Sequence, residues 1–165
     1  MNFRGILGVL GLMTGAVISG PAFAQAADAT MPMSAEVVQR CNVTATPMRF
    51  TVANPGANTN VDSSATVRVE CSAFSFFLVE LDNGENAVGN QRRMVGAYNG
   101  GTLNYEIYKN AARTQRWGQG FFGGRLGLIF GTGAVNFTAY GRIPTVTTFD
   151  AADAYYDNIV VTVSF

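Results

Sequence analysis

Few residues of this chain could carry out covalent or metal chemistry, and the two cysteines are the most informative of them. Cys41 and Cys71 do not form a CxxC redox motif. A zinc site would have to combine them with carboxylates, which is a poor ligand set, because the chain contains no histidine. In an exported chain a lone cysteine pair is expected to form a disulfide. That bond would close a loop of about 30 residues and contribute roughly 3.5 kcal/mol.

Three other motifs resemble functional sites. Gly118–Gly123 matches GxGxxG, but it lacks the flanking strand and helix that a dinucleotide site requires. Asp82–Asn86 resembles part of a calcium loop without its alternating acidic ligands, and it predicts a hairpin turn instead. Asp150, Asp153 and Asp157 could pair as acid and base in principle, but a solvated turn is the better interpretation.

Composition excludes further classes of function. Without histidine, Ser-His-Asp and Cys-His nucleophile systems are impossible within the chain. The 11 basic and 11 acidic residues balance, so there is no basic footprint for nucleic acid. The 12 phenylalanines and 6 tyrosines are many for one domain, and some of them could line a partner surface. We expect a structural or binding protein and no enzyme, cofactor or metal site.

Residues 1–24 have the layout of a secretory signal peptide. Arg4 supplies a positive charge, an apolar run extends from Gly5 to Ile18, and Ala22-Phe23-Ala24 provides a cleavage site after Ala24. The alternative is a membrane anchor, but the run is shorter than the ~20 residues of a spanning helix. The sequence therefore predicts export, an oxidising environment for the two cysteines, and no stable membrane insertion after cleavage.

Beyond this segment, apolar and polar residues alternate with a period of two, which is typical of strands with one buried face. Strands are expected over 29–37, 41–46, 65–72, 74–81, 103–108, 135–144 and 156–165. The strand at 74–81 is expected to have little exposed face, because apolar residues occupy both of its sides. Residues 83–101 are expected to form a loop, and 118–133 a glycine-rich strand and loop region. Short strands with turn signals indicate an all-β antiparallel sandwich or barrel.

Six segments occur in a telling order: Cys41–Pro47, Arg92–Met94, Leu103–Tyr108, Ala111–Gly118, Tyr140–Pro144 and Tyr156–Phe165. Together they resemble the spore coat protein U domain, the subunit family of archaic chaperone–usher pili, over about residues 38–165. The resemblance implies an incomplete immunoglobulin-like antiparallel β-sandwich with Greek-key connections. Such subunits lack their last strand, which leaves a hydrophobic groove. A periplasmic chaperone fills the groove first, and the N-terminal extension of another subunit replaces it in the fibre.

On this resemblance, residues 25–37 are a donor-strand extension that inserts Met31, Met33, Ala35 and Val37 into a neighbour. Pro32 cannot donate to a ladder, so two alternatives stay open: a donor strand that begins at Met33, and an N-terminus without a partner.

The same resemblance assigns one face of the C-terminal strand to the edge of the groove, where the chaperone also binds. The residues on this face are Ile159, Val161, Val163 and Phe165. The alternative is an ordinary core strand, which would bury the same side chains.

The expected function is that of a secreted pilus subunit that polymerises by donor-strand complementation and serves surface attachment and biofilm formation. Its expected partners are like subunits, a periplasmic chaperone and an outer-membrane usher. Two alternatives remain: a stand-alone spore or cell-envelope coat protein that fills its own groove, and a minor adhesive subunit. The second is suggested by the heavy, aromatic residues at 121–130, where the family has small ones.

Overall fold

The computed structural model describes residues 30–36, 38–53, 55–56, 60–147, 150 and 152–165. The chain divides into two units, one ending at Glu36 and one beginning at Val37. In the first unit, residues 30–36 form no regular element and their side chains are exposed. The alternating pattern of this segment therefore forms no strand by itself, since a strand needs a ladder partner for its backbone groups. The predicted signal peptide lies outside the described residues.

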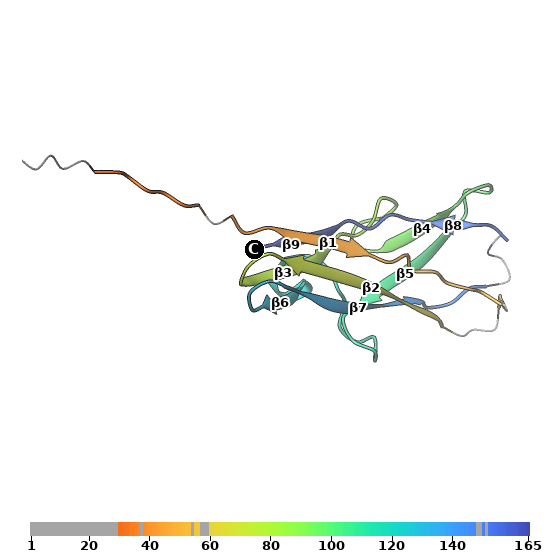
Figure 1. Ribbon diagram of the computed structural model, residues 1–165. Helices are drawn as coiled ribbons and strands as arrows, with labels where there is room; N and C mark the ends of the chain where they lie inside the picture. The colour runs from red at the N-terminus through yellow and green to blue at the C-terminus, as the bar shows by residue number, and fades with distance from the viewer. Residues whose placement is uncertain (1–29, 37, 54, 57–59, 148–149, 151) are drawn as a thin grey trace, which may run out of the picture. The chain divides into compact units, whose positions relative to one another are not determined.

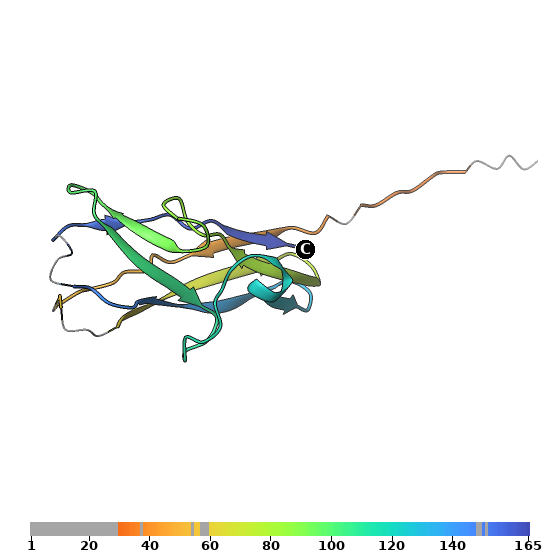
Figure 2. The ribbon, with the colours of Figure 1, turned by 180° about the vertical axis from the view of Figure 1, so that it is seen from behind.

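The described part of the second unit consists mainly of two antiparallel sheets (Figures 1 and 2). The larger sheet contains, in spatial order, β1 (Cys41–Ala45), β2 (Val61–Cys71), β7 (Gly133–Ile143), β5 (Thr102–Tyr108), β4 (Arg92–Gly96) and β8 (Tyr155–Tyr156). The smaller sheet contains β6 (Arg125–Ile129), β3 (Ser75–Leu81) and β9 (Val161–Ser164). A single helical turn, α1 (Gly120–Gly123), precedes β6. The predicted all-β antiparallel sandwich is confirmed.

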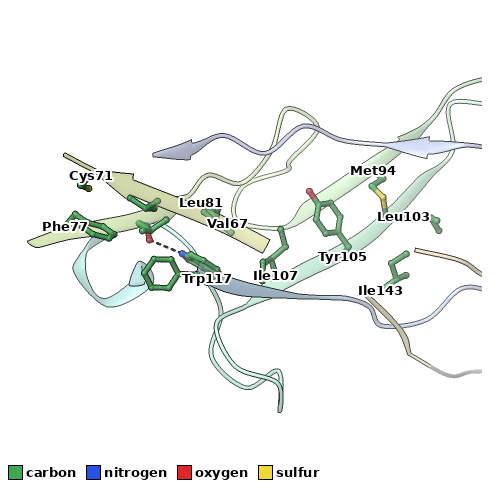
Figure 3. Packing of buried hydrophobic residues seen from close by; sticks show 14 of the residues in the cluster. Val67, Cys71, Phe77, Leu81, Met94, Leu103, Tyr105, Ile107, Trp117 and Ile143 are labelled. Carbon is green, nitrogen blue, oxygen red and sulfur yellow. Dashed lines mark hydrogen bonds between the residues drawn. The ribbon is translucent and has the colours of Figure 1, made fainter. Parts of the chain in front are cut away.

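The core lies between the two sheets and is built from alternate residues of their strands (Figure 3). Trp117 is fully buried at its centre, and its indole N–H donates a 2.9 Å hydrogen bond to the carbonyl of Val79. Its ring packs edge-on against Phe137, with 6.2 Å between the ring centroids. The indole thus fills the gap between the sheets and satisfies its one polar group at the same time.

One strand lies where a loop was expected, and another falls in the region expected to contain both strand and loop. β4 falls inside the predicted loop at 83–101. The sequence did not indicate this strand, because Arg92 looks like a surface residue but is completely buried beside Glu106. β6 falls in the glycine-rich region at 118–133. A Cβ at Gly127 would lie only 2.3 Å from the ring of Phe77, so this glycine lets the ring pack directly beneath the strand.

The strand at 74–81 also differs from expectation. It has one fully buried face, which carries Phe77 and Val79, but its other face is only partly covered. Phe76 exposes 57% of its surface. The expectation of little exposed face was wrong, because no described element covers the whole outer side of the smaller sheet.

The chain crosses from one sheet to the other at two places where a single hairpin or strand was expected. At the predicted Asp82–Gly84 turn, the N–H of Gly84 donates to Oδ1 of Asp82, and Gly84 has a φ of +86°. The turn exists, but it is not a hairpin, since β3 and β4 belong to different sheets. The single strand predicted at 156–165 is likewise divided, because β8 pairs with β4 in one sheet and β9 with β3 in the other.

Candidate functional site

Each sheet ends in a strand with one open edge on the same side of the sandwich. β1 is the terminal strand of the larger sheet and pairs with β2, and β9 is the terminal strand of the smaller sheet and pairs with β3. The two strands lie side by side in both ribbon views (Figures 1 and 2). Within the described residues no ladder joins them. Their facing backbone groups are therefore available to a strand from elsewhere.

A largely apolar cleft of about 390 Å³ opens where β1 ends and β9 begins, and it reaches the core. Ala45 of β1, Val161 of β9 and the segments that follow β1 and precede β9 contribute to its lining. Its floor includes Ala65 of β2 and Ala139 of β7, which are direct partners in the β2–β7 ladder. Two methyl groups at adjacent positions leave the cleft deep where larger residues would fill it. Its walls include Met48, Leu81 and Tyr105. A cleft of this size and lining can take several apolar side chains from an extended segment.

The structure separates the four predicted groove-edge residues into two groups. Ile159 and Val161 line the cleft. Val163 is partly buried against the core but does not line the cleft, and Phe165, beyond the last residue of β9, exposes 61% of its surface. The chaperone-binding role of this edge stays a prediction.

A polar cluster closes one end of the cleft. The hydroxyl of Tyr105 donates a 2.7 Å hydrogen bond to Oδ2 of Asp157, while the backbone N–H and the side-chain amide of Asn86 both donate to Oδ1 of Asp157. Burial, followed by the hydrogen bond to Asp157, raises the pKa of the Tyr105 phenol above its ordinary value. Asp157 was expected in a solvated turn. Sequence reasoning missed its role because its partners lie far away along the chain.

Asp82 fixes the first part of the β9 edge. Its side-chain Oδ1 accepts a 3.0 Å hydrogen bond from the N–H of Val160, and its backbone N–H donates to the carbonyl of Val160 at 3.1 Å. The N–H of Glu85 donates to the carbonyl of Asn158. These bonds hold the segment before β9 against the turn after β3, so the edge is ordered without a neighbouring strand.

The disulfide fixes the other edge. Cys41 and Cys71 are bonded, as predicted, and they are direct partners at the start of the β1–β2 ladder. The ladder continues outward, because the N–H of Ser72 donates to the carbonyl of Arg40 at 2.9 Å. The edge strand β1 is thus anchored to β2 by a covalent bond worth roughly 3–4 kcal/mol in the chain-entropy account.

Three of the four predicted donor residues, Met31, Met33 and Ala35, belong to the first unit. Met31 and Met33 expose 81% and 87% of their surfaces, and Ala35 is also exposed. Val37 lies outside the described residues. Their insertion into a groove stays a prediction.

No group of three or more histidine, cysteine, aspartate or glutamate residues in the described part of the chain is placed to hold a metal ion. None of the described helices is long and apolar enough to cross a membrane.

The family model of the spore coat protein U domain matches residues 27–162. The chain belongs to this family. No curated protein is detectably similar to this spore coat protein U domain.

Among solved structures, this spore coat protein U domain is similar to a chain in the CsuC–CsuE chaperone–tip adhesion subunit pre-assembly complex from the archaic chaperone–usher Csu pili of Acinetobacter baumannii. The identity is 28% and the TM-score 0.55. The match covers 78% of this chain but only 40% of that one, so this chain spans about two fifths of its length. A second match is HdaB, the minor tip subunit of the Escherichia coli Hda pilus, with 13% identity, coverage of 74% and 79%, and a TM-score of 0.41.

Proposed function

We propose that this chain is an exported structural subunit of an archaic chaperone–usher pilus, and that the cleft between β1 and β9 receives a strand from another protein. The observation that carries the proposal is the pair of open sheet edges on either side of an apolar cleft. An inserted strand can form main-chain ladders with these edges, while alternate side chains enter the cleft and set the register.

The donor in the fibre is the segment 25–37 of another copy. Its alternating apolar residues, Met31, Met33, Ala35 and Val37, share one face of an extended chain. Unbranched methionine suits the deep part of the cleft above Ala65 and Ala139. Burial of the larger side chains is worth ~1.5–3 kcal/mol each, or roughly 5–10 kcal/mol for the segment before ordering costs. Pro32 contributes no N–H, so the ladder is interrupted at that residue.

Before assembly, a periplasmic chaperone fills the same cleft against the β9 edge, and an outer-membrane usher exchanges it for the donor segment. The chain reaches the cell surface after cleavage behind Ala24, and the fibre serves attachment and biofilm formation. The 28% identity with a chain of an archaic chaperone–usher pilus complex supports this assignment.

Two variants of the exported chain test the proposal. Deletion of residues 25–37 should leave chaperone binding intact and abolish addition to another subunit, because only the donor is removed. Ala65→Leu should weaken binding of a peptide of residues 29–37 at least tenfold, because the larger side chain fills the cleft floor. Ala134→Leu is the matched control, since Ala134 is exposed on β7 and does not line the cleft.

Fibre assembly by the deletion variant, or equal peptide binding by the Ala65→Leu and Ala134→Leu proteins, would contradict the proposal. A stable monomer that binds neither the peptide nor the chaperone would instead indicate a stand-alone coat protein. The near-ultraviolet circular dichroism of buried Trp117 checks that each variant is folded.

A further inference from the structure

The outer side of the smaller sheet carries a cluster of exposed apolar side chains. Along β3, Phe77 and Val79 point into the core, so Phe76 and Leu78 point outward. On β6, Leu126 and Leu128 are exposed and lie opposite Leu78 and Phe76 in the ladder. Cross-strand pairs of this kind place the four side chains in one contiguous layer.

Aromatic residues extend this layer at both ends. At one end the rings of Phe74 and Phe130 pack with 5.7 Å between their centroids, and both are exposed. At the other end Gly124, directly after α1, lies against Leu78, because a Cβ at Gly124 would fall 2.7 Å from a methyl carbon of that leucine. α1 carries two further exposed rings, Phe121 and Phe122. We call the whole surface the aromatic face; it comprises Phe74, Phe76, Leu126, Leu128 and Phe130 together with Phe121 and Phe122.

The α1 end of the aromatic face is held firmly. The ammonium group of Lys109 donates to the carbonyls of Phe122 and Gly124, at 2.8 and 3.2 Å. The N–H of Gly120 donates to Oε1 of Glu80 at 2.5 Å. Phe122 exposes 91% of its surface although its backbone is fixed at these points. A partner would therefore meet a preorganised surface and lose little free energy to ordering it.

The extent of the aromatic face matches what one side of a stable protein interface needs. At about 150–250 Å² per aromatic side chain, its five partly exposed phenylalanines offer roughly 500–900 Å². A standard interface buries about 800 Å² per partner, whereas the largest apolar patch on a typical monomer is about 300–600 Å². The face is thus comparable to one side of a standard interface and lies at or above the upper part of the range for a typical monomer.

The charge pattern of the aromatic face favours its own copy as the partner. Residues 74–79 and 126–130 include no charged side chain, so two such faces meet without like-charge repulsion. The polar residues lie at the border, where Glu80, Thr162 and Ser164 occupy the outer side of β3 and β9. An apolar centre with a polar rim is the anatomy of a specific interface.

We propose that the aromatic face joins two copies of this chain in an isologous, two-fold contact. The face is separate from the cleft, because Thr162 and Ser164 of β9 lie between the two. One copy can therefore engage a neighbour through the aromatic face while its cleft is occupied. Between two fibres, this contact would hold a subunit of one fibre against a subunit of its neighbour. The inference does not depend on the proposed strand exchange.

Analytical ultracentrifugation of the exported chain, from Gln25 onward, tests this contact. The wild type should form a dimer, and Phe76→Ser with Leu128→Ser should raise its dissociation constant at least tenfold. Val88→Ser with Tyr98→Ser is the matched control, because both residues are exposed apolar residues outside the aromatic face. Met31→Asp with Met33→Asp should leave this dimer unchanged, since these substitutions affect only the predicted donor segment.

Each other result overturns the proposal. A wild-type monomer at high concentration excludes the contact, and a dimer lost only in the methionine variant arises from strand exchange. A monomer that binds octyl resin through Phe76 and Leu128 shows that the aromatic face serves another apolar surface. Should the double serine variant fail to fold, Leu128→Cys provides a second test. Its thiols should cross-link two copies on oxidation, Val88→Cys should not, and equal cross-linking by both would refute the two-fold contact.

Discussion

The phenol of Tyr105 donates a 2.7 Å hydrogen bond to Oδ2 of Asp157, and this bond joins the buried part of β5 to the segment that leads into β9. Asn86 donates twice to the other carboxylate oxygen of Asp157. One carboxylate therefore links the larger sheet, the loop after β3 and the approach to the cleft edge. These contacts hold the wall of the cleft in place from three separate parts of the chain.

The stability of the protein should depend on the phenol of Tyr105 at alkaline pH. Burial and the Asp157 hydrogen bond raise the pKa of Tyr105, so the folded protein holds this proton more tightly than the unfolded chain does. The stabilisation is complete below the ordinary tyrosine pKa of about 10 and is lost as the pH rises above it, by up to ~1.4 kcal/mol per pH unit. The difference in unfolding free energy between wild type and Tyr105→Phe should therefore shrink between pH 9 and 11.

Urea unfolding at a series of pH values measures this difference. Tyr98→Phe, at an exposed position, should follow the wild type throughout. A wild-type advantage over Tyr105→Phe that stays constant up to pH 11 would show that the phenol does not carry the pH dependence.

The buried ion pair of β4 and β5 should be a major point of weakness. Arg92 is completely buried, 2.5 Å from Oε1 of Glu106, and burial lowers the pKa of its guanidinium. Glu106→Gln leaves this buried charge without a carboxylate and should destabilise the fold by ~3–5 kcal/mol. The control is Glu70→Gln in the exposed pair with Arg68, where a loss of at most ~1 kcal/mol is expected. Similar urea midpoints for the two variants would be inconsistent with a structural role for the buried pair.

A methyl group at Gly127 should disturb the packing beneath the aromatic face. Its Cβ would lie 2.3 Å from the ring of Phe77 and 3.0 Å from that of Phe137. Gly127→Ala should lower the melting temperature and reduce stability by ~1–3 kcal/mol, because the two rings cannot both keep their positions. Gly133→Ala is the control, since its Cβ would meet Ile129 at a tolerable 3.4 Å. If both variants melt like the wild type, the close approach at Gly127 is not required.

The positions of most strands could be predicted from the sequence, because alternation is a local property. β1 and β3 fall within their predicted ranges, while β2, β5 and β7 match theirs but begin four, one and two residues earlier than predicted. The disulfide was also predictable, since two cysteines allow one pairing. β4 escaped prediction because the neutralisation of Arg92 depends on Glu106, which lies on the next strand.

The amino-acid sequence by itself determined the class of fold, the family and which alternate side chains of a strand share one face. Only the tertiary structure decided which of those faces and edges remain open. The cleft exists because β1 and β9 end different sheets, and the aromatic face exists because the outward side of β3 is incompletely covered. Alternation specifies two sides of a strand but not what packs on either, since packing is decided by contacts between residues distant in the chain.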